Sequence, residues 1–250
     1  MKANKWLVVT AAVAGATLVI AILVLAAPSL ATFLHAQGVG AAQQGNLDLA
    51  LAELTWVIRF DPRNAVAYYD RSDVYRRKSL PALAIADLTQ AIQLDPHWAV
   101  AYCARGAAYV TLGNYTQALA DHTHAIGLLP QEPAFYAGRA VAYQLSGDYE
   151  SAVADYSETL RLDPADTSTY LSRGLLYASR GDYDRAIADY TQAIQLAPKF
   201  SAAYLNRAMA YRERQQNPEA VQDLQMYLTL EPHGPNRAQL EQQIRKLGGP

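Results

Sequence analysis

The sequence repeats itself at a fixed interval of 34 residues. The stretch IADLTQAIQLDP, which begins at Ile85, returns as IADYTQAIQLAP at Ile187, an offset of three such intervals. A proline recurs at every step of the same interval: Pro62, Pro96, Pro130, Pro164, Pro198 and Pro232. A fixed period in this range predicts a solenoid of similar units, in which each unit buries its apolar face against its neighbours.

Each period contains the pattern of two helices. Two tyrosines stand seven residues apart, at 68 and 75, 102 and 109, 136 and 143, 170 and 177, and 204 and 211. This spacing places both rings on one helical face, so we assign them to core packing. A glycine follows at Gly45, Gly113, Gly147 and Gly181, which suits the positive φ at a helix C-terminus. Each unit is therefore predicted to be a helix, a turn and a second helix.

A second pattern pairs charges across the two predicted helices. Arginine recurs at Arg71, Arg105, Arg139, Arg173 and Arg207, and an acidic residue recurs on the second helix at Glu53, Asp87, Asp121, Asp155, Asp189 and Asp223. Arginines on a core-facing position are costly to bury unpaired. We predict a ladder of arginine–aspartate pairs between helices. The alternative is a row of arginines that recognises an acidic ligand.

The unit resembles the tetratricopeptide repeat. The residues that carry the resemblance are an aromatic at the fourth position, a small residue at the eighth, an aromatic at the eleventh, alanine at the twentieth and proline at the thirty-second. The resemblance implies an all-α, right-handed superhelical α-solenoid with six repeats, at residues 31–64, 65–98, 99–132, 133–166, 167–200 and 201–234. Residues 235–250 are predicted to form a C-terminal capping helix, with Leu240, Ile244 and Leu247 on one face.

The first 30 residues differ from the repeats. Residues 7–27 carry no charge and follow Lys2 and Lys5, which predicts a signal-anchor that forms a single transmembrane helix. The positive-inside rule then places the N-terminus in the cytoplasm and the repeats on the outer side, periplasmic or extracellular. The alternative is a signal peptide cleaved near Ala31, which would give a secreted protein.

The sequence offers little for catalysis. The single cysteine, Cys103, excludes an internal disulfide and a cysteine-based zinc site. His122 and His124 are two residues apart and point in different directions on a helix, so we assign His122 to packing. A net charge of −2 gives no basic field for nucleic acid. We therefore predict no cofactor, no metal and no enzyme activity.

The family resemblance implies a concave groove lined by the first helix of each repeat. The residues of this chain at the family's groove positions are Tyr69, Asp73, Arg76, Arg77, Val100, Cys103, Ala107, Val110, Ala137, Val141, Gln144, Leu171, Leu175, Ala178, Leu205, Met209 and Arg212. The middle of this set is uncharged, which suits an apolar helix or strand with acidic flanks.

The sequence therefore predicts a membrane-tethered scaffold or adaptor for protein–protein interaction, which binds a partner peptide or helix of unknown identity in the groove. One alternative is a structural subunit or self-assembling component of a membrane-associated complex. In another, the groove is filled by the capping helix, by the sequence after the membrane span, or by a second copy in a homo-oligomer.

Overall fold

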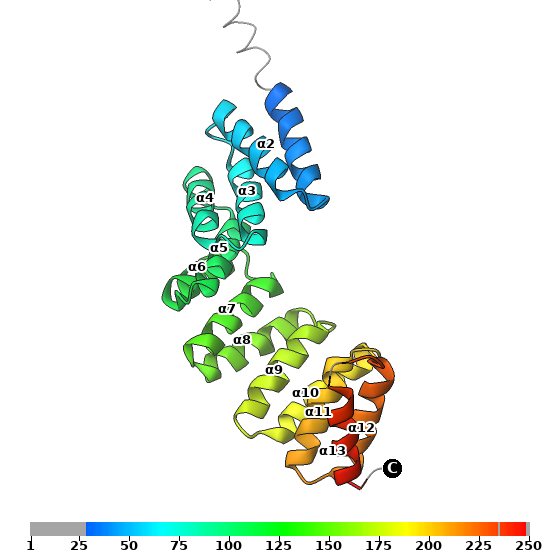
Figure 1. Cartoon of the computed structure of the whole chain (residues 1–250). Helices are drawn as coiled ribbons and strands as arrows, with labels where there is room; N and C mark the ends of the chain where they lie inside the picture. Colours follow the sequence, from blue (N-terminus) through cyan, green and yellow to red (C-terminus); the bar gives the residue numbers. More distant parts are fainter. Residues whose placement is uncertain (1–28, 235, 249–250) are drawn as a thin grey trace, which may run out of the picture. The chain divides into compact units, whose positions relative to one another are not determined.

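The computed structural model describes residues 29–234 and 236–248, and these residues form helices joined by short turns (Figure 1). No β-strand occurs among them. They divide into two compact units, of which the first ends at Asn114 and the second begins at Tyr115. The predicted all-α class is thus confirmed for the described residues.

Within each unit successive helices pack on one another, and most of them form antiparallel pairs (Figure 1). The first unit holds a helical segment at 29–43, α2 (Leu47–Phe60), α3 (Ala65–Arg77), α4 (Pro81–Leu94) and α5 (Ala99–Thr111). The second holds α6 (Tyr115–Leu128), α7 (Pro133–Ser146), α8 (Tyr149–Leu162), α9 (Thr167–Ser179), α10 (Tyr183–Leu196), α11 (Ser201–Glu213), α12 (Asn217–Leu230) and α13 (Arg237–Lys246). Pairs such as α7–α8 and α9–α10 pack closely, and α8 packs in turn on α9. The solenoid type of architecture follows, while the hand of the superhelix and the count of six repeats stay predictions.

Helix starts are fixed by side chains that accept hydrogen bonds from the first backbone amides. Asn64 accepts from the amide of Ala67 at 3.0 Å, and Asp148 accepts from the amide of Ser151 at 3.2 Å. Elsewhere a proline stands in the first turn, as at Pro81 and Pro133. Both devices deal with the amides that have no partner inside the helix, because a cap supplies an acceptor and proline has no N–H.

The turn inside each pair requires a left-handed backbone. Gly147 has φ of 89°, and the amide of the next residue, Asp148, donates to the carbonyl of Tyr143 at 2.9 Å. In two turns the glycine is replaced, by Ser79 and by Gln215, and both keep a φ of 59°. These two residues therefore hold a conformation that side chains other than glycine adopt at a cost.

Glycines leave space for large side chains where helices cross, within a pair at α9–α10 and between neighbouring pairs at α6–α7. A Cβ atom added to Gly174 would lie 2.6 Å from Cε1 of Tyr190, and one added to Gly138 would lie 2.5 Å from Cε1 of His122. Tyr190 and His122 are 1% exposed. Large side chains from the second helices thus fill the space that glycines on the first helices leave open.

The predicted arginine–aspartate ladder is confirmed at four places. In each pair the arginine Nε and Nη2 atoms both donate to the carboxylate, with Nε–Oδ2 distances of 2.7–2.9 Å. The aspartates are 3–7% exposed. The pairs are Arg71–Asp87, Arg139–Asp155, Arg173–Asp189 and Arg207–Asp223.

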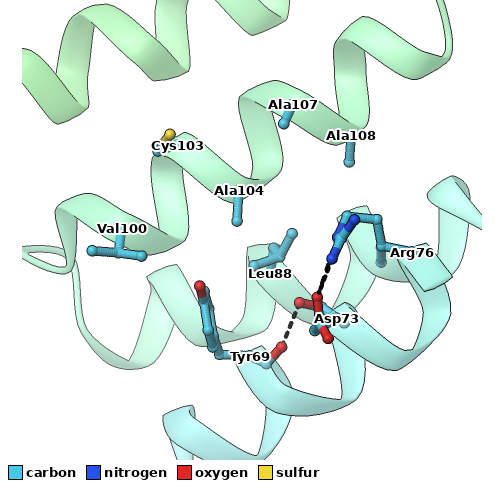
Figure 2. Close-up of a pocket in the computed structure, with 11 residues that line it drawn as sticks. Tyr69, Asp73, Arg76, Leu88, Val100, Cys103, Ala104, Ala107 and Ala108 are labelled. Carbon is cyan, nitrogen blue, oxygen red and sulfur yellow. Dashed lines mark hydrogen bonds and ion pairs between the residues drawn. The ribbon is translucent and has the colours of Figure 1, made fainter. Parts of the chain in front are cut away.

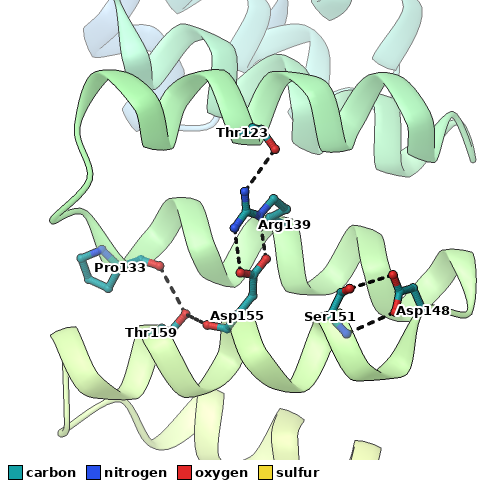
Figure 3. A network of polar contacts seen from close by, with 7 residues as sticks. All are labelled: Thr123, Pro133, Arg139, Asp148, Ser151, Asp155 and Thr159. Carbon is teal, nitrogen blue, oxygen red and sulfur yellow. Dashed lines mark hydrogen bonds and ion pairs between the residues drawn. The ribbon is translucent and has the colours of Figure 1, made fainter.

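Each arginine of the ladder also reaches the preceding helix pair. Figure 3 shows Nη1 of Arg139, on α7, donating to Oγ1 of Thr123 on α6, at 3.1 Å, while Asp155 on α8 takes the other two nitrogens. The guanidinium carbon lies 5.8 Å from the ring centre of Tyr136 and 5.9 Å from that of Tyr143. One side chain therefore joins three helices, and the recurring tyrosines flank its charge.

The structure contradicts the predicted membrane localisation. Among residues 29–234 and 236–248, no helix is both long enough and apolar enough to cross a bilayer. The predicted span itself, residues 7–27, lies outside the described residues.

Candidate partner-binding surface

A pocket in the first unit brings together six of the predicted groove residues (Figure 2). Its volume is about 360 Å³. Its lining comprises Tyr69, Ser72, Asp73 and Arg76 from α3, Ala84 and Leu88 from α4, and Val100, Cys103, Ala104, Ala107 and Ala108 from α5. We call it the α3–α5 pocket.

Helical spacing explains why these side chains converge. Tyr69, Asp73 and Arg76 are four and three residues apart, so they share one face of α3. The facing side of α5 carries alanines such as Ala104 and Ala107, whose short side chains leave the space open. The pocket therefore has an aromatic wall on one side and a shallow, apolar wall on the other.

Neighbouring groups hold the polar side of the pocket in place. The ring of Tyr69 packs against Trp98 with their centres 4.8 Å apart. Burial, followed by the charge of Asp73, raises the pKa of the Tyr69 hydroxyl above its usual value. Asp73 Oδ1 lies 2.6 Å from Nη2 of Arg76, and these side chains are 43% and 61% exposed. The phenol thus stays neutral, and the ion pair lies at the rim, open to solvent.

The two other predicted residues of the first unit lie elsewhere. Arg77 lines a second hollow of about 230 Å³, which shares Tyr69 and Asp73 with the α3–α5 pocket, and its Nη1 donates to the carbonyl of Ala42 at 2.6 Å. Beside it, Nε2 of His35 and Oδ2 of Asp70 are 2.6 Å apart. Val110 is half-buried on α5 and is not part of the lining of either hollow.

In the second unit the predicted residues of α7 and α9 include two exposed apolar side chains. Val141 is 39% exposed and Leu175 is 41% exposed. The side chain of Gln144 is engaged within the fold, because its Oε1 accepts a hydrogen bond from the hydroxyl of Tyr156 at 2.9 Å. The remaining predicted residues of these two helices, Ala137, Leu171 and Ala178, are half-buried. We call the exposed pair, Val141 and Leu175, the α7–α9 strip.

Helix α13 covers the predicted groove residues of α11. Leu205 and Met209 pack against the core cluster that contains Leu240 and Ile244, and Gln243 Nε2 lies 3.8 Å from Sδ of Met209. The last predicted residue, Arg212, is exposed and pairs with the adjacent Glu213 at 2.7 Å. One alternative drawn from the sequence was that the capping helix fills the groove. Helix α13 does cover the groove positions Leu205 and Met209.

Sequence reasoning missed a third hollow, of about 430 Å³, in the second unit. Its lining includes Tyr149, Tyr177, Arg180 and Arg185, with Arg180 4.9 Å from the ring centre of Tyr149. A signal was present in the tyrosines that stand two residues after the turn glycines at Tyr115, Tyr149 and Tyr183.

His122 is the one buried group with unsatisfied polar atoms in the described part of the chain. Both ring nitrogens are buried and lack a hydrogen-bond partner. Burial lowers the pKa of His122 from 6.5 to about 4, so the ring is neutral at physiological pH. No cluster of three or more metal-ligating side chains occurs among the described residues.

Comparisons with known proteins agree on the family. A family model described as tetratricopeptide repeat matches residues 35–97 and 103–167, and two further models with the same description match residues 168–200 and 189–222. Among proteins with curated descriptions, none matches this chain.

Many solved structures are similar. PilW, described as a widely conserved type IV pilus biogenesis factor, gives a TM-score of 0.76 at 13% identity, with 84% of this chain and 97% of that chain covered. MamA gives a TM-score of 0.61 at 25% identity, covering 69% of this chain and 94% of that chain. YrrB, described as a TPR protein with an unusual peptide-binding site, gives 0.59 at 19% identity, covering 77% and 97%.

Proposed function

This chain belongs to the tetratricopeptide repeat family, and we propose that it is a scaffold that binds a partner peptide or helix on the first helices of its repeats. The proposal assigns the main contact to the α3–α5 pocket and a second contact to the α7–α9 strip. Tetratricopeptide repeat proteins are in general non-catalytic, and the function proposed for this chain is the binding of a partner protein.

The α3–α5 pocket carries the proposal. Its volume of about 360 Å³ lies at the lower end of the range for ligand sites, roughly 300–1,000 Å³. Valine, leucine and alanine side chains make up most of its lining. A pocket of this kind suits one large apolar side chain that projects from a partner helix or strand.

The rim of the pocket adds charge selectivity. Asp73 and Arg76 are each more than a third exposed, and an exposed ion pair contributes little to stability, about 0–1 kcal/mol. A partner can therefore replace one member of the pair at small cost. A partner carboxylate beside Arg76 fits the acidic flank expected from the sequence.

The α7–α9 strip supports a second, apolar contact. Val141 and Leu175 stand at the same repeat position on two successive first helices, 34 residues apart. Both side chains are among the exposed large hydrophobic residues, and apolar side chains exposed on successive first helices favour a binding role. YrrB, which shares the fold, is described as having a peptide-binding site, and this supports the proposal by analogy alone.

The test is affinity capture from the native extract with the full chain and two matched pairs of variants. Ala107→Glu places a charge in the α3–α5 pocket, while Ala86→Glu makes the same change at an exposed position of α4 in the same unit. Leu175→Glu and Leu196→Glu form the second pair, because these leucines are 41% and 45% exposed. All four variants are first checked for an unchanged melting temperature.

The expected result is a partner that is captured by the wild type, Ala86→Glu and Leu196→Glu and is lost with Ala107→Glu, because an unpaired charge is costly in an apolar pocket. Loss with Leu175→Glu would show that the α7–α9 strip makes a contact of its own. Capture that is equally strong with Ala107→Glu would refute binding at the α3–α5 pocket.

A further inference from the structure

Helix α2 carries an aromatic face that the repeat does not require. Leu49, Ala52, Trp56 and Phe60 are three or four residues apart and lie on one side of the helix. Leu49 is 43%, Trp56 47% and Phe60 40% exposed, and Ala52 is exposed as well. We call these four residues the α2 face.

Comparison of α2 with the other second helices shows that its aromatics are exceptions. The position of Trp56 is taken in later repeats by Gln90, His124, Glu158, Gln192 and Met226, and that of Phe60 is taken each time by leucine. The fold therefore accepts polar or flexible side chains at the position of Trp56 and does not need an aromatic ring there. An exposed tryptophan next to an exposed phenylalanine has the composition of an interaction surface.

The two rings are already ordered without a partner. Trp56 and Phe60 stack with centres 5.9 Å apart and planes at 26°, and the guanidinium of Arg59 lies 5.1 Å from the centre of the Trp56 ring. Side chains that are held in place lose less conformational entropy when they bind. The α2 face is therefore prepared for contact.

We infer that the α2 face binds the α2 face of a second copy of this chain, with the two helices antiparallel about a two-fold axis near residue 54. In that arrangement Trp56 lies over the second copy's Ala52, Phe60 lies against the second copy's Leu49, and Arg59 faces the second copy's Asp48. The midpoints of these three pairs fall within about one residue of each other, or roughly 1.5 Å along the helix.

Helix geometry places each of these pairs on the same side of the contact. Asp48 and Arg59 are eleven residues apart, which is about three turns, so they lie in one line along one flank of the α2 face. Leu49 and Phe60 have the same separation and lie in one line on the opposite flank. A two-fold axis perpendicular to an antiparallel pair brings each line against its own copy, so Phe60 meets a leucine on one flank and Arg59 meets a carboxylate on the other.

The charges are accessible for this contact. The side chain of Asp48 is 88% exposed although it also contacts Lys78, and Arg59 is exposed. A helix of 14 residues is about 21 Å long. The area that one helix face of this length buries on each copy is small compared with the total of about 1,600 Å² in a stable interface. The dimer is therefore weak and concentration-dependent, and it leaves the α3–α5 pocket out of the contact.

The test is sedimentation velocity of the full chain over a series of increasing concentrations. The key variant is Trp56→Gln, since glutamine already stands at this position in two other repeats and is compatible with the fold. The matched control is Met226→Gln, at the same repeat position on α12, where the side chain is 42% exposed. We expect reversible dimerisation of the wild type and of Met226→Gln, and at least about 30-fold weaker association of Trp56→Gln.

Charge reversal tests the antiparallel pairing itself. Arg59→Asp alone and Asp48→Arg alone place like charges together and should each weaken the dimer about 3- to 10-fold. The double variant restores opposite charges across the axis and should regain the association of the wild type. A chain that stays monomeric, a Trp56→Gln variant that associates as strongly as the wild type, or a double variant that regains nothing would each overturn the inference. None of these outcomes bears on the α3–α5 pocket.

Discussion

His122 should make the stability of this protein depend on pH in the mildly acidic range. The folded protein holds the ring neutral, because burial lowers the pKa of His122 to about 4, against 6.5 when the chain is unfolded. Between these two values the unfolded chain binds more protons than the folded one, so the free energy of unfolding falls as the pH falls. The stability that the neutral ring permits is complete above about pH 7 and is lost progressively down to about pH 4.

The size of this effect follows from the two pKa values. A shift of one unit corresponds to 1.36 kcal/mol, so the full loss is about 3 kcal/mol, of which about 2 kcal/mol is reached at pH 5. Other charged groups near the ring are Asp121 on the same helix, Arg139 on α7 and Asp155 on α8, and burial outweighs all three. At pH 5 the loss can be measured before most carboxylates are protonated.

The assay is urea unfolding of the wild type and of His122→Leu at pH 7 and pH 5. Leucine is the residue at the same repeat position on α4, where Leu88 is 2% exposed, so the variant is compatible with the fold. It also removes the two unpartnered nitrogens, so its stability at pH 7 should be at least that of the wild type. The loss between pH 7 and pH 5 should be about 2 kcal/mol larger in the wild type. An equal loss in both proteins would refute the reasoning.

Three further substitutions test the fold. Asp155→Ala leaves a half-buried guanidinium unpaired and should lower the free energy of unfolding by about 3 kcal/mol. The control Glu158→Ala removes an exposed ion pair of the same helix and should change the free energy of unfolding little. Urea unfolding of both variants measures the difference, and equal effects would contradict a structural role of the ladder. Gly174→Ala should destabilise the protein by about 1–3 kcal/mol, because its Cβ would lie 2.6 Å from a tyrosine ring. Gly127→Ala meets no atom within 4 Å and should stabilise α6 by up to about 1 kcal/mol. The melting temperature should therefore fall in the first variant and rise in the second. Ser79→Gly should stabilise by about 1 kcal/mol by removing the strain of a positive φ, and an unchanged melting temperature would contradict that strain.

The helix pairs and their packing could be predicted because the 34-residue period repeats the same structural positions in every unit. A residue that recurs every 34 positions occupies the same environment in every unit, so one structural reason explains all its copies. The arginine–aspartate pairs are the clearest case, since a charged residue repeated at a core-facing position demands a partner. Tyr69 and Ala107, which the family resemblance assigned to a groove, line one pocket, while their role in binding a partner stays a prediction.

The period does not reveal how the ends of a stack are covered. Met209 stands at the same repeat position as the exposed Leu175, yet helix α13 packs on Met209 and on the neighbouring Leu205. Likewise the N-terminal apolar stretch predicts a membrane localisation that the described helices contradict. The sequence predicted a capping helix but left open what fills the groove, because the repeat pattern contains no signal for contacts made by segments outside it.

Departures from the period are where function is expected. A side chain that serves the fold is needed in every repeat, whereas one that serves a single partner is needed once. Asp73 is the one charged residue at its groove position, where later repeats have Ala107, Val141, Leu175 and Met209. Trp56 is the one aromatic at its own position on the second helices. Both are more than a third exposed, so packing explains neither, and the two proposals assign each of them to a binding surface of its own.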